Sequence, residues 1–239
     1  MSLMPDMFQI ELGENLYPNI LTKMLGSKAP KTLYCLGNIS LLTRPSVGFC
    51  GSRKASEKGL ETARDCASQA SELGMVVVSG NAAGVDVQAH YHALSSGGST
   101  IIVLPEGIDH FRIRKYLDPV WNWERVLVVS QFEPQQIWQA YRAMARNKVI
   151  ISLSGAMIVI EAGERGGTLD AGRSTLDMGL PLFVAQYENM ISEAQGNKLL
   201  LEMGGVPLNR LRSTNRANMA RVNDSLSDPN IALVQPNLL

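Results

Sequence analysis

The feature that most constrains the fold is a regular alternation, from residue 46 onward, of short apolar segments with longer amphipathic ones. The apolar segments are VGFC (47–50), MVVVS (75–79), TIIVL (100–104), VLVVS (126–130), AMIVIE (156–161) and PLFVA (181–185). Such segments, without polar alternation, are typical of strands buried on both faces of a parallel sheet. Between the first two, Leu60, Ala63, Ala67, Ala70 and Leu73 recur every three or four residues, which predicts an amphipathic helix. The alternation predicts a doubly wound α/β fold, with a largely parallel sheet and helices on both faces.

The chain divides into three predicted parts. Residues 46–208 carry the alternation and are expected to form the core domain. Residues 1–45, which include LYPNILTKML, are expected to form a small helical lead-in that covers an edge of the sheet. Residues 209–239 lose periodicity and gain Asn, Ser and Arg, so we expect a loosely packed tail.

Charge and cysteine content limit the class of protein. The chain has 22 Lys and Arg against 22 Asp and Glu, so any surface for nucleic acid must be a local one. Cys35, Cys50 and Cys66 share no metal-type spacing and cannot all pair, which favours a reduced compartment. The N-terminus lacks a signal-peptide pattern, and the apolar runs are too short to span a bilayer. We expect a soluble, cytoplasmic protein with no membrane partner.

Three of the predicted strands end in glycine-bearing polar segments. These are GSRKAS (51–56), SGNAAGVD (79–86) and EAGERGGT (161–168). The carboxyl ends of the strands of a doubly wound sheet meet at one edge, where ligands bind. Glycine lets the backbone approach an anion, a helix N-terminus favours negative charge, and Arg53 can hold a phosphate through two bonds. Hydroxyl donors could come from Ser52, Ser56, Ser79 and Thr168. The three segments together predict an anion site in preference to three plain turns.

Other chemistry has weaker support. The chain contains no G-x-x-x-x-G-K-[ST] segment, and no G-x-G-x-x-G follows the first strand, which argues against a nucleotide-driven motor or a nicotinamide dehydrogenase. His90 and His92 point to different sides of a predicted helix and cannot share a metal. His90 is interpreted as a packing or loop-bracing residue and not as a catalyst. Asp86 is first of all a helix N-cap, and Glu161 is interpreted as a capping or solvated residue. No metal and no redox cofactor is implied.

Three tryptophans have two interpretations each. Trp121, Trp123 and Trp138 could stack on nucleic-acid bases, although aromatic side chains more often pack in a core or an interface.

The ordered segments resemble the DNA-processing protein A (DprA/Smf) family over about residues 16–205. The resemblance is carried by LYPNILTKML, LYCLGNISLL, VGFCGSRKASEKG, VVVSGNAAGVDVQAHYHAL, TIIVLPEGID, ARNKVIISLSGAMIVIEAGERGGTLDAG and AQGNKLLLEMGG. It implies an extended Rossmann-like fold that binds single-stranded DNA without catalysis. It also implies a role in DNA uptake and natural transformation, loading of a RecA-type recombinase, and a homodimer.

The resemblance also carries over particular residues. Gly51, Ser52 and Arg53 match the phosphate-gripping turn of the family. Its second glycine loop is matched by Gly80, Gly84, Asp86 and His90, and its R-N-R/K segment beside the DNA pocket by Arg146, Asn147 and Lys148. The predicted DNA- or phosphate-binding residues are Gly51, Ser52, Arg53, Lys54, Ser56, Ser79, Gly80, Gly84, Arg146, Asn147, Lys148, Gly166, Gly167 and Thr168.

The sequence departs from the family pattern at several places. Ala82, Ala83 and Gly84 stand where the family usually has A-R-G, which puts the affinity for DNA in question. VAQY (184–187) replaces the family's AVPG, and the short tail leaves no room for the winged-helix domain that many members carry.

Two alternatives to a DNA-binding protein stay open. One is a small-nucleotide-binding protein or an enzyme similar to the lysine-decarboxylase-like phosphoribohydrolases, which have P-G-G-x-G-T-x-x-E. Here GERGGTLDAG lacks the proline, and Ala171 and Gly172 stand where the glutamate would be, which argues against base-releasing catalysis. The other is a scaffold that only contacts a recombinase.

Overall fold

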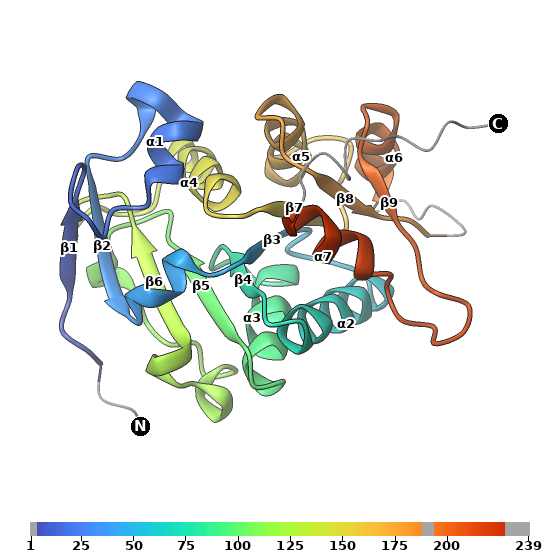
Figure 1. The fold of residues 1–239 in the computed structure, drawn as a ribbon, viewed down its shortest axis with the longest axis horizontal. Helices are drawn as coiled ribbons and strands as arrows, with labels where there is room; N and C mark the ends of the chain where they lie inside the picture. The colour runs from blue at the N-terminus through green and yellow to red at the C-terminus, as the bar shows by residue number, and fades with distance from the viewer. Residues whose placement is uncertain (1–3, 188–193, 228–239) are drawn as a thin grey trace.

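The structure is a computed structural model that describes residues 4–187 and 194–227. Its centre is a nine-stranded sheet with the order β1-β2-β6-β5-β4-β3-β7-β8-β9 (Figure 1). The strands are β1 (Phe8–Glu11), β2 (Thr32–Gly37), β3 (Ser46–Cys50), β4 (Val76–Ser79), β5 (Ser99–Val103), β6 (Val126–Ser130), β7 (Ala156–Val159), β8 (Leu182–Ala185) and β9 (Val206–Leu208). The strands from β3 to β9 pair in parallel, whereas β1 and β2 are antiparallel to their neighbours.

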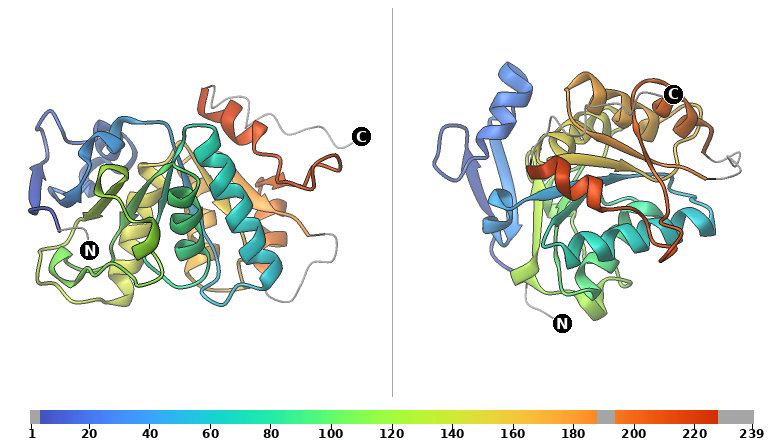
Figure 2. Two further views of the ribbon diagram at one scale, coloured as in Figure 1. Left: turned by 90° about the horizontal axis from the view of Figure 1, so that it is seen from below. Right: turned by 45° about the vertical axis from the view of Figure 1, so that its right-hand side comes forward.

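Helices cover both faces of this sheet (Figures 1 and 2). The helices are α1 (Asn19–Leu25), α2 (Glu57–Glu72), α3 (Val85–Ser95), α4 (Ala140–Ser152), α5 (Gly167–Asp177), α6 (Gln195–Glu202) and α7 (Ala220–Ser227). One core cluster joins the sheet to α1, α4, α5 and α6, and a second joins it to α2, α3 and α7. The prediction of a doubly wound, Rossmann-like α/β fold is confirmed.

The strand order reverses between β3 and β7, and this reversal positions the site. From β3 the chain moves through β4, β5 and β6 toward one edge of the sheet, and β7, β8 and β9 then build toward the other edge. The loops that follow β3 and β7 therefore diverge to opposite faces and leave a crevice beyond the carboxyl ends of these two strands. Ligands of open α/β sheets bind at such a switch point.

The N-terminal segment differs from the expected helical lead-in. Besides α1 it contributes β1 and β2, which extend the sheet by two antiparallel strands in place of covering its edge. Leu33 and Cys35 of β2 are fully buried, and β1 buries only Ile10. β1 therefore depends mainly on its pairing with β2, whereas β2 also buries apolar side chains of its own.

The tail also differs in part from the expectation. Met219 and Val222 are buried in the second core cluster, beneath α2, and the backbone N–H of Ala217 donates to Asp65 at 2.6 Å. Arg216 forms ion pairs with Asp65 and Glu72 of α2. Residues 216–226 are therefore packed against the domain, whereas residues 209–215 are exposed. The rest of the expected tail lies outside the described residues.

The three cysteines are free thiols. Within residues 4–187 and 194–227, no helix is long and apolar enough to cross a membrane.

Candidate functional site

The three glycine-bearing loops meet at the switch point, around a hollow of about 540 Å³ that we call the central hollow. Its walls come from the first loop (51–54), from Ala82 and Asp86 of the second loop and from the third loop (161–168). The N-terminal half of α4 closes it with residues 143–147. The three loops that the sequence predicted to form an anion site thus share one hollow.

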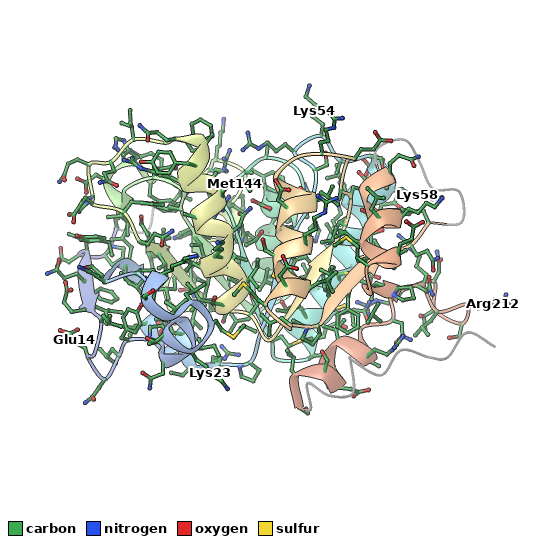
Figure 3. The ribbon with its side chains drawn as sticks, turned by 90° about the horizontal axis from the view of Figure 1, so that it is seen from above. Glu14, Lys23, Lys54, Lys58, Met144 and Arg212 are labelled. Atoms are coloured by element: carbon green, nitrogen blue, oxygen red, sulfur yellow. The ribbon has the colours of Figure 1, made fainter. Side chains whose placement is uncertain are left out.

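The first loop presents two cations in different ways. The hydroxyl of Ser52 accepts a hydrogen bond from the backbone N–H of Lys54 at 3.0 Å, which fixes the turn. Arg53 and Lys54 are both exposed, and neither forms an ion pair in the part of the chain that the structure describes. Lys54 points outward from the edge of the molecule (Figure 3). Arg53 lines the central hollow and also a second hollow beside it.

Two glycines of the second loop allow close packing at the site. A Cβ on Gly84, whose φ is +77°, would lie 2.3 Å from the Ser52 carbonyl oxygen, so the first and second loops interlock there. A Cβ on Gly80 would lie 1.8 Å from Nη1 of Arg146. Asp86 accepts a hydrogen bond from the backbone N–H of Ala82 at 3.1 Å and closes the loop. These two glycines therefore shape the hollow by allowing close packing, independently of any contact that they make with a bound anion.

The third loop leads into a helix N-terminus that no side chain caps. Gly166 has a φ of +112° and precedes α5, whose first turn has no side-chain cap. The first backbone N–H groups of a helix have no partner within it and favour an anion. In contrast, the N-terminus of α2 is capped by a side chain of the protein. The hydroxyl of Ser56 accepts from the N–H of Gly59 and donates to the buried Glu161, which also accepts from the N–H of Ser56 at 2.8 Å.

Arg146 is a buried cation between the two hollows. Only 7% of its surface is exposed, and its Nη1 donates to the Val103 carbonyl at 2.9 Å. Its Nε has no partner within the described part of the chain. Burial lowers the pKa of Arg146, whereas Asp86 and Glu106 act to raise it. Because a guanidinium stays protonated in proteins, Arg146 presents an incompletely satisfied positive charge to both hollows.

Two side chains at the site are unsuited to acid–base or nucleophilic chemistry. Loss of hydration raises the pKa of the Cys50 thiol to about 12, so this thiol is protonated at neutral pH. Burial lowers the pKa of His90, and its Nε2–H donates to the Gly80 carbonyl at 2.6 Å, because a carbonyl can only accept. Its Nδ1 lies 2.6 Å from the Thr100 hydroxyl, which itself donates to the Val77 carbonyl at 2.8 Å. His90 braces the second loop, as the sequence analysis interpreted it.

The predicted site residues fall into two groups. Those that line the central hollow are Gly51, Ser52, Arg53, Lys54, Arg146, Asn147, Gly166, Gly167 and Thr168. The others differ from the expectation. Ser79 is fully buried and donates to the Phe49 carbonyl at 2.8 Å, so its hydroxyl serves the fold, as does that of Ser56. Lys148 lines a third hollow of about 400 Å³, between α1, α4 and α5.

The second hollow, which we call the flanking hollow, was missed by the sequence analysis. It has a volume of about 460 Å³ and shares Arg53 and Arg146 with the central hollow. Glu106, Arg114 and Trp138 come to it from separate loops. Trp121 and Trp123 instead pack edge-on against each other and near Phe111. Trp138 differs from the other two tryptophans in that 50% of its surface is exposed. The exposure of a side chain cannot be read from the sequence.

Comparisons with known proteins support the resemblance. Residues 9–215 match the family model described as DNA recombination-mediator protein A. The DNA processing protein DprA of Streptococcus pneumoniae is 33% identical over 178 residues, which cover 74% of this chain and 62% of that protein. Protein Smf of Borreliella burgdorferi is 30% identical over 176 residues, covering 72% of this chain and 55% of that protein. The chain thus spans less than two thirds of the length of these two relatives.

Two solved structures of DNA processing protein A also match this chain. The X-ray structure of DNA processing protein A from S. pneumoniae matches with a TM-score of 0.74 and 30% identity, over 84% of this chain and 70% of that one. A structure of DNA processing protein A from Helicobacter pylori, described for its single-stranded DNA binding mode, matches with a TM-score of 0.71 and 27% identity. That match covers 85% of this chain and 91% of the other.

Proposed function

The chain belongs to the DNA recombination-mediator protein A family, and we propose that it is a non-catalytic protein that binds single-stranded DNA. The observation that carries this proposal is the convergence of Arg53, Arg146 and the open N-terminus of α5 on the central hollow. The H. pylori relative is described as binding single-stranded DNA, which supports the same ligand here.

The proposed binding mode rests on backbone phosphates. Arg53 would grip a phosphate through two N–H groups, and Arg146 would supply a fixed positive charge behind it. The N–H groups at the start of α5 would receive an adjacent phosphate, with Thr168 beside them. A strand held by phosphates at the bottom of a hollow needs freedom to bend inward, which a stiff duplex lacks. We therefore propose a preference for single strands.

The absent loop arginine has a candidate replacement. Arg114 approaches the second loop from elsewhere in the chain, and its Nε donates to Asn81 Oδ1 at 2.9 Å. It thus brings a cation to the loop in which Ala82, Ala83 and Gly84 replace the A-R-G of the family. This contact favours retained affinity for DNA.

The partners are part of the proposal. By family membership we propose that the protein acts in DNA uptake and natural transformation, loads a RecA-type recombinase, and works as a homodimer in the cytoplasm. The region GNKLLLEMGGVPL (196–208) was expected to contribute to the dimer or to be the last core helix. Leu200, Val206 and Leu208 are buried within the chain, which leaves Met203, at 47% exposure, as its exposed apolar residue.

The enzyme alternative has little support at the site. Glu161 would be the candidate acid or base, but Ser56 already donates two hydrogen bonds to it. His90 is buried and engaged through both ring nitrogens. Glu161 and His90 are therefore not free to act as an acid–base pair that releases a base from a nucleotide.

A competition titration tests the proposal. Labelled oligo-dT is titrated with the protein, alone and in the presence of a panel of mononucleotides. We expect tight binding of oligo-dT that mononucleotides do not displace. Tight mononucleotide binding with weak oligo-dT binding would contradict the proposal and support a nucleotide-binding protein.

A further inference from the structure

The third hollow, of about 400 Å³, contains no residue of the three glycine-bearing loops. Two of its walls come from α4 and α5, which pack side by side, and Met144 stands on α4 (Figure 3). Leu25 at the end of α1, Lys28 in the turn that follows it, and Gln131 after β6 complete the lining. Ligand pockets have volumes of roughly 300–1,000 Å³, so this hollow can hold a small organic molecule.

Much of the wall of the third hollow is apolar. Leu25 and Ala145 are half-buried, Ala171 is buried, and Met144 remains 44% exposed. A methionine side chain is flexible and polarizable, so it can adapt its shape to an apolar group beside it. A molecule with an aliphatic or aromatic side chain would remove the exposed surface of Met144 from water, which is favourable.

One polar atom in the lining is buried without a partner. The side-chain Nε2 of Gln131 is inaccessible to solvent and accepts or donates no hydrogen bond within the described part of the chain. The backbone on either side of Gln131 is fixed, because the Ser130 hydroxyl accepts from the N–H of Phe132 at 3.1 Å. Buried polar atoms in proteins almost always have a hydrogen-bond partner. An amide N–H can only donate, so this group favours an acceptor oxygen in the hollow.

Charged side chains of both signs line the same hollow. Lys28 and Lys148 are exposed, and Asp170 is half-buried in the first turn of α5. None of the three forms an ion pair within residues 4–187 and 194–227. An ammonium only donates hydrogen bonds and a carboxylate only accepts them. A molecule that carries both a carboxylate and an ammonium would therefore satisfy the lysines and Asp170 together.

We propose that the third hollow binds a small zwitterion with an apolar side chain, which is the chemistry of a free amino acid such as leucine, methionine or phenylalanine. The carboxylate of the ligand accepts from Nε2 of Gln131 and from the ammonium of Lys28 or Lys148. Its own ammonium donates to the carboxylate of Asp170, and its side chain packs against Met144. The site is separate from the proposed binding of DNA and does not rest on it.

Isothermal titration calorimetry with amino acids and their derivatives tests the site on the full chain. Leucine, methionine and phenylalanine are titrated first, and we expect saturable binding of at least one of them at millimolar concentration. N-acetyl-leucine lacks the ammonium and leucinamide lacks the carboxylate. Each should bind about 10- to 150-fold more weakly than leucine, the range that corresponds to a hydrogen bond to a charged group.

Variants locate the binding in the third hollow. Asp170→Asn should weaken binding of leucine by the same factor but leave binding of N-acetyl-leucine unchanged, because that molecule has no ammonium to lose. Asp177→Asn is the matched control, since Asp177 lies on the same helix, is exposed and lines no described hollow. It should bind leucine like the wild type.

A second variant tests the buried amide. Gln131→Met removes the unpaired N–H and keeps a side chain of similar length, so it should weaken binding of leucine without lowering thermal stability. Lys23→Met on α1 is the control, because Lys23 is exposed and lines no described hollow. Thermal unfolding of every variant identifies any loss of binding that comes from loss of the fold.

Several results would overturn the proposal. One is failure of all three amino acids to bind at millimolar concentration. Another is binding of N-acetyl-leucine or leucinamide as tight as that of leucine, and a third is an equal loss in Asp177→Asn and Asp170→Asn. Displacement of leucine by oligo-dT would assign the hollow to the DNA site and would also overturn it. Binding of leucine that oligo-dT leaves unchanged would support a separate site.

Discussion

Two arginines line the central hollow, and they differ in burial. Arg146 is buried and held by the Val103 carbonyl, whereas Arg53 is exposed and follows the fixed turn at Ser52. A buried guanidinium contributes a constant field, and an exposed one can rearrange to make two parallel bonds to a phosphate. Arg53 is therefore the better residue for measuring phosphate binding without disturbing the fold.

Replacement of Arg53 should weaken binding more than replacement of Lys54. We expect Arg53→Ala to weaken oligonucleotide binding by about 1.5–3 kcal/mol, the range for a hydrogen bond to a charged group. Arg53→Lys should recover only part of this loss. Lys54→Ala should cost much less, because a lysine ammonium is a mobile point charge and cannot make the planar two-bond contact, and Lys54 extends outward (Figure 3). Binding titrations and thermal unfolding on the three variants check this. Wild-type binding by Arg53→Ala would mean that the first loop is only a turn.

His90 should make the stability depend on pH. Burial lowers the pKa of His90 in the folded state, so below the unfolded value of about 6.5 the unfolded chain binds more protons. The free energy of unfolding should therefore fall as the pH drops through about 6.5, by at most about 1.4 kcal/mol per pH unit. His90→Gln removes this contribution, so the difference in stability between wild type and variant should narrow in acid.

Urea denaturation between pH 7 and pH 5 measures the difference that His90→Gln makes. Thr100→Val is the matched control, because it removes the hydroxyl bonded to His90 and keeps the titrating imidazole. It should lower stability but retain the wild-type slope with pH. A difference between wild type and His90→Gln that stays constant over this range would show that His90 does not contribute to the slope.

At the scale of elements, the second loop and α4 position each other. Gly80 lets the guanidinium of Arg146 pass over the loop, since a Cβ there would lie 1.8 Å from Nη1. Gly80→Ala should displace Arg146 and weaken oligonucleotide binding. If displacement is the cause, the double variant with Arg146→Met should bind no more weakly than Arg146→Met alone. Additive losses in the double variant would contradict this mechanism.

Some helices and strands could be predicted from the sequence and others could not, depending on how strongly each is apolar in its own residues. The six predicted strands are all present, because each is buried on both faces and is apolar enough to stand out locally. β1 has four residues with only Ile10 buried, so its identity comes from pairing with β2. The meeting of the three loops followed from topology, since parallel strands end at one edge.

Individual side-chain roles were harder to predict, because they depend on distant partners. Ser79 bonds a carbonyl 30 residues away, and Ser56 bonds a carboxylate 105 residues away. Neither partner is visible from the local sequence, so both hydroxyls looked available for a ligand. The flanking hollow was missed for the same reason, because Glu106 and Trp138 come from loops that only the folded sheet brings together.

At the scale of the whole molecule, we expect a two-fold dimer. A short single-strand site gains reach and affinity when two copies share one strand, because the second contact becomes intramolecular. Light scattering at micromolar concentration should give about twice the chain mass of 26.0 kDa. A mass near that of one chain would contradict the dimer, and loss of tight binding to long but not short strands on dilution would support it.

Charge balance over the whole molecule makes salt dependence an informative measurement. Because basic and acidic residues number 22 each, net charge gives no general attraction for DNA. The salt response should therefore report the local contacts. The logarithm of the affinity for oligo-dT should fall linearly with the logarithm of salt concentration, with a slope of roughly −0.7 for each phosphate neutralised. Arg53→Ala should make this slope shallower by about 0.7, the loss of one phosphate contact. A hairpin duplex should bind more weakly than oligo-dT at every salt concentration. A flat salt response, an unchanged slope in Arg53→Ala, or equal affinity for the hairpin would contradict binding through phosphates in the central hollow.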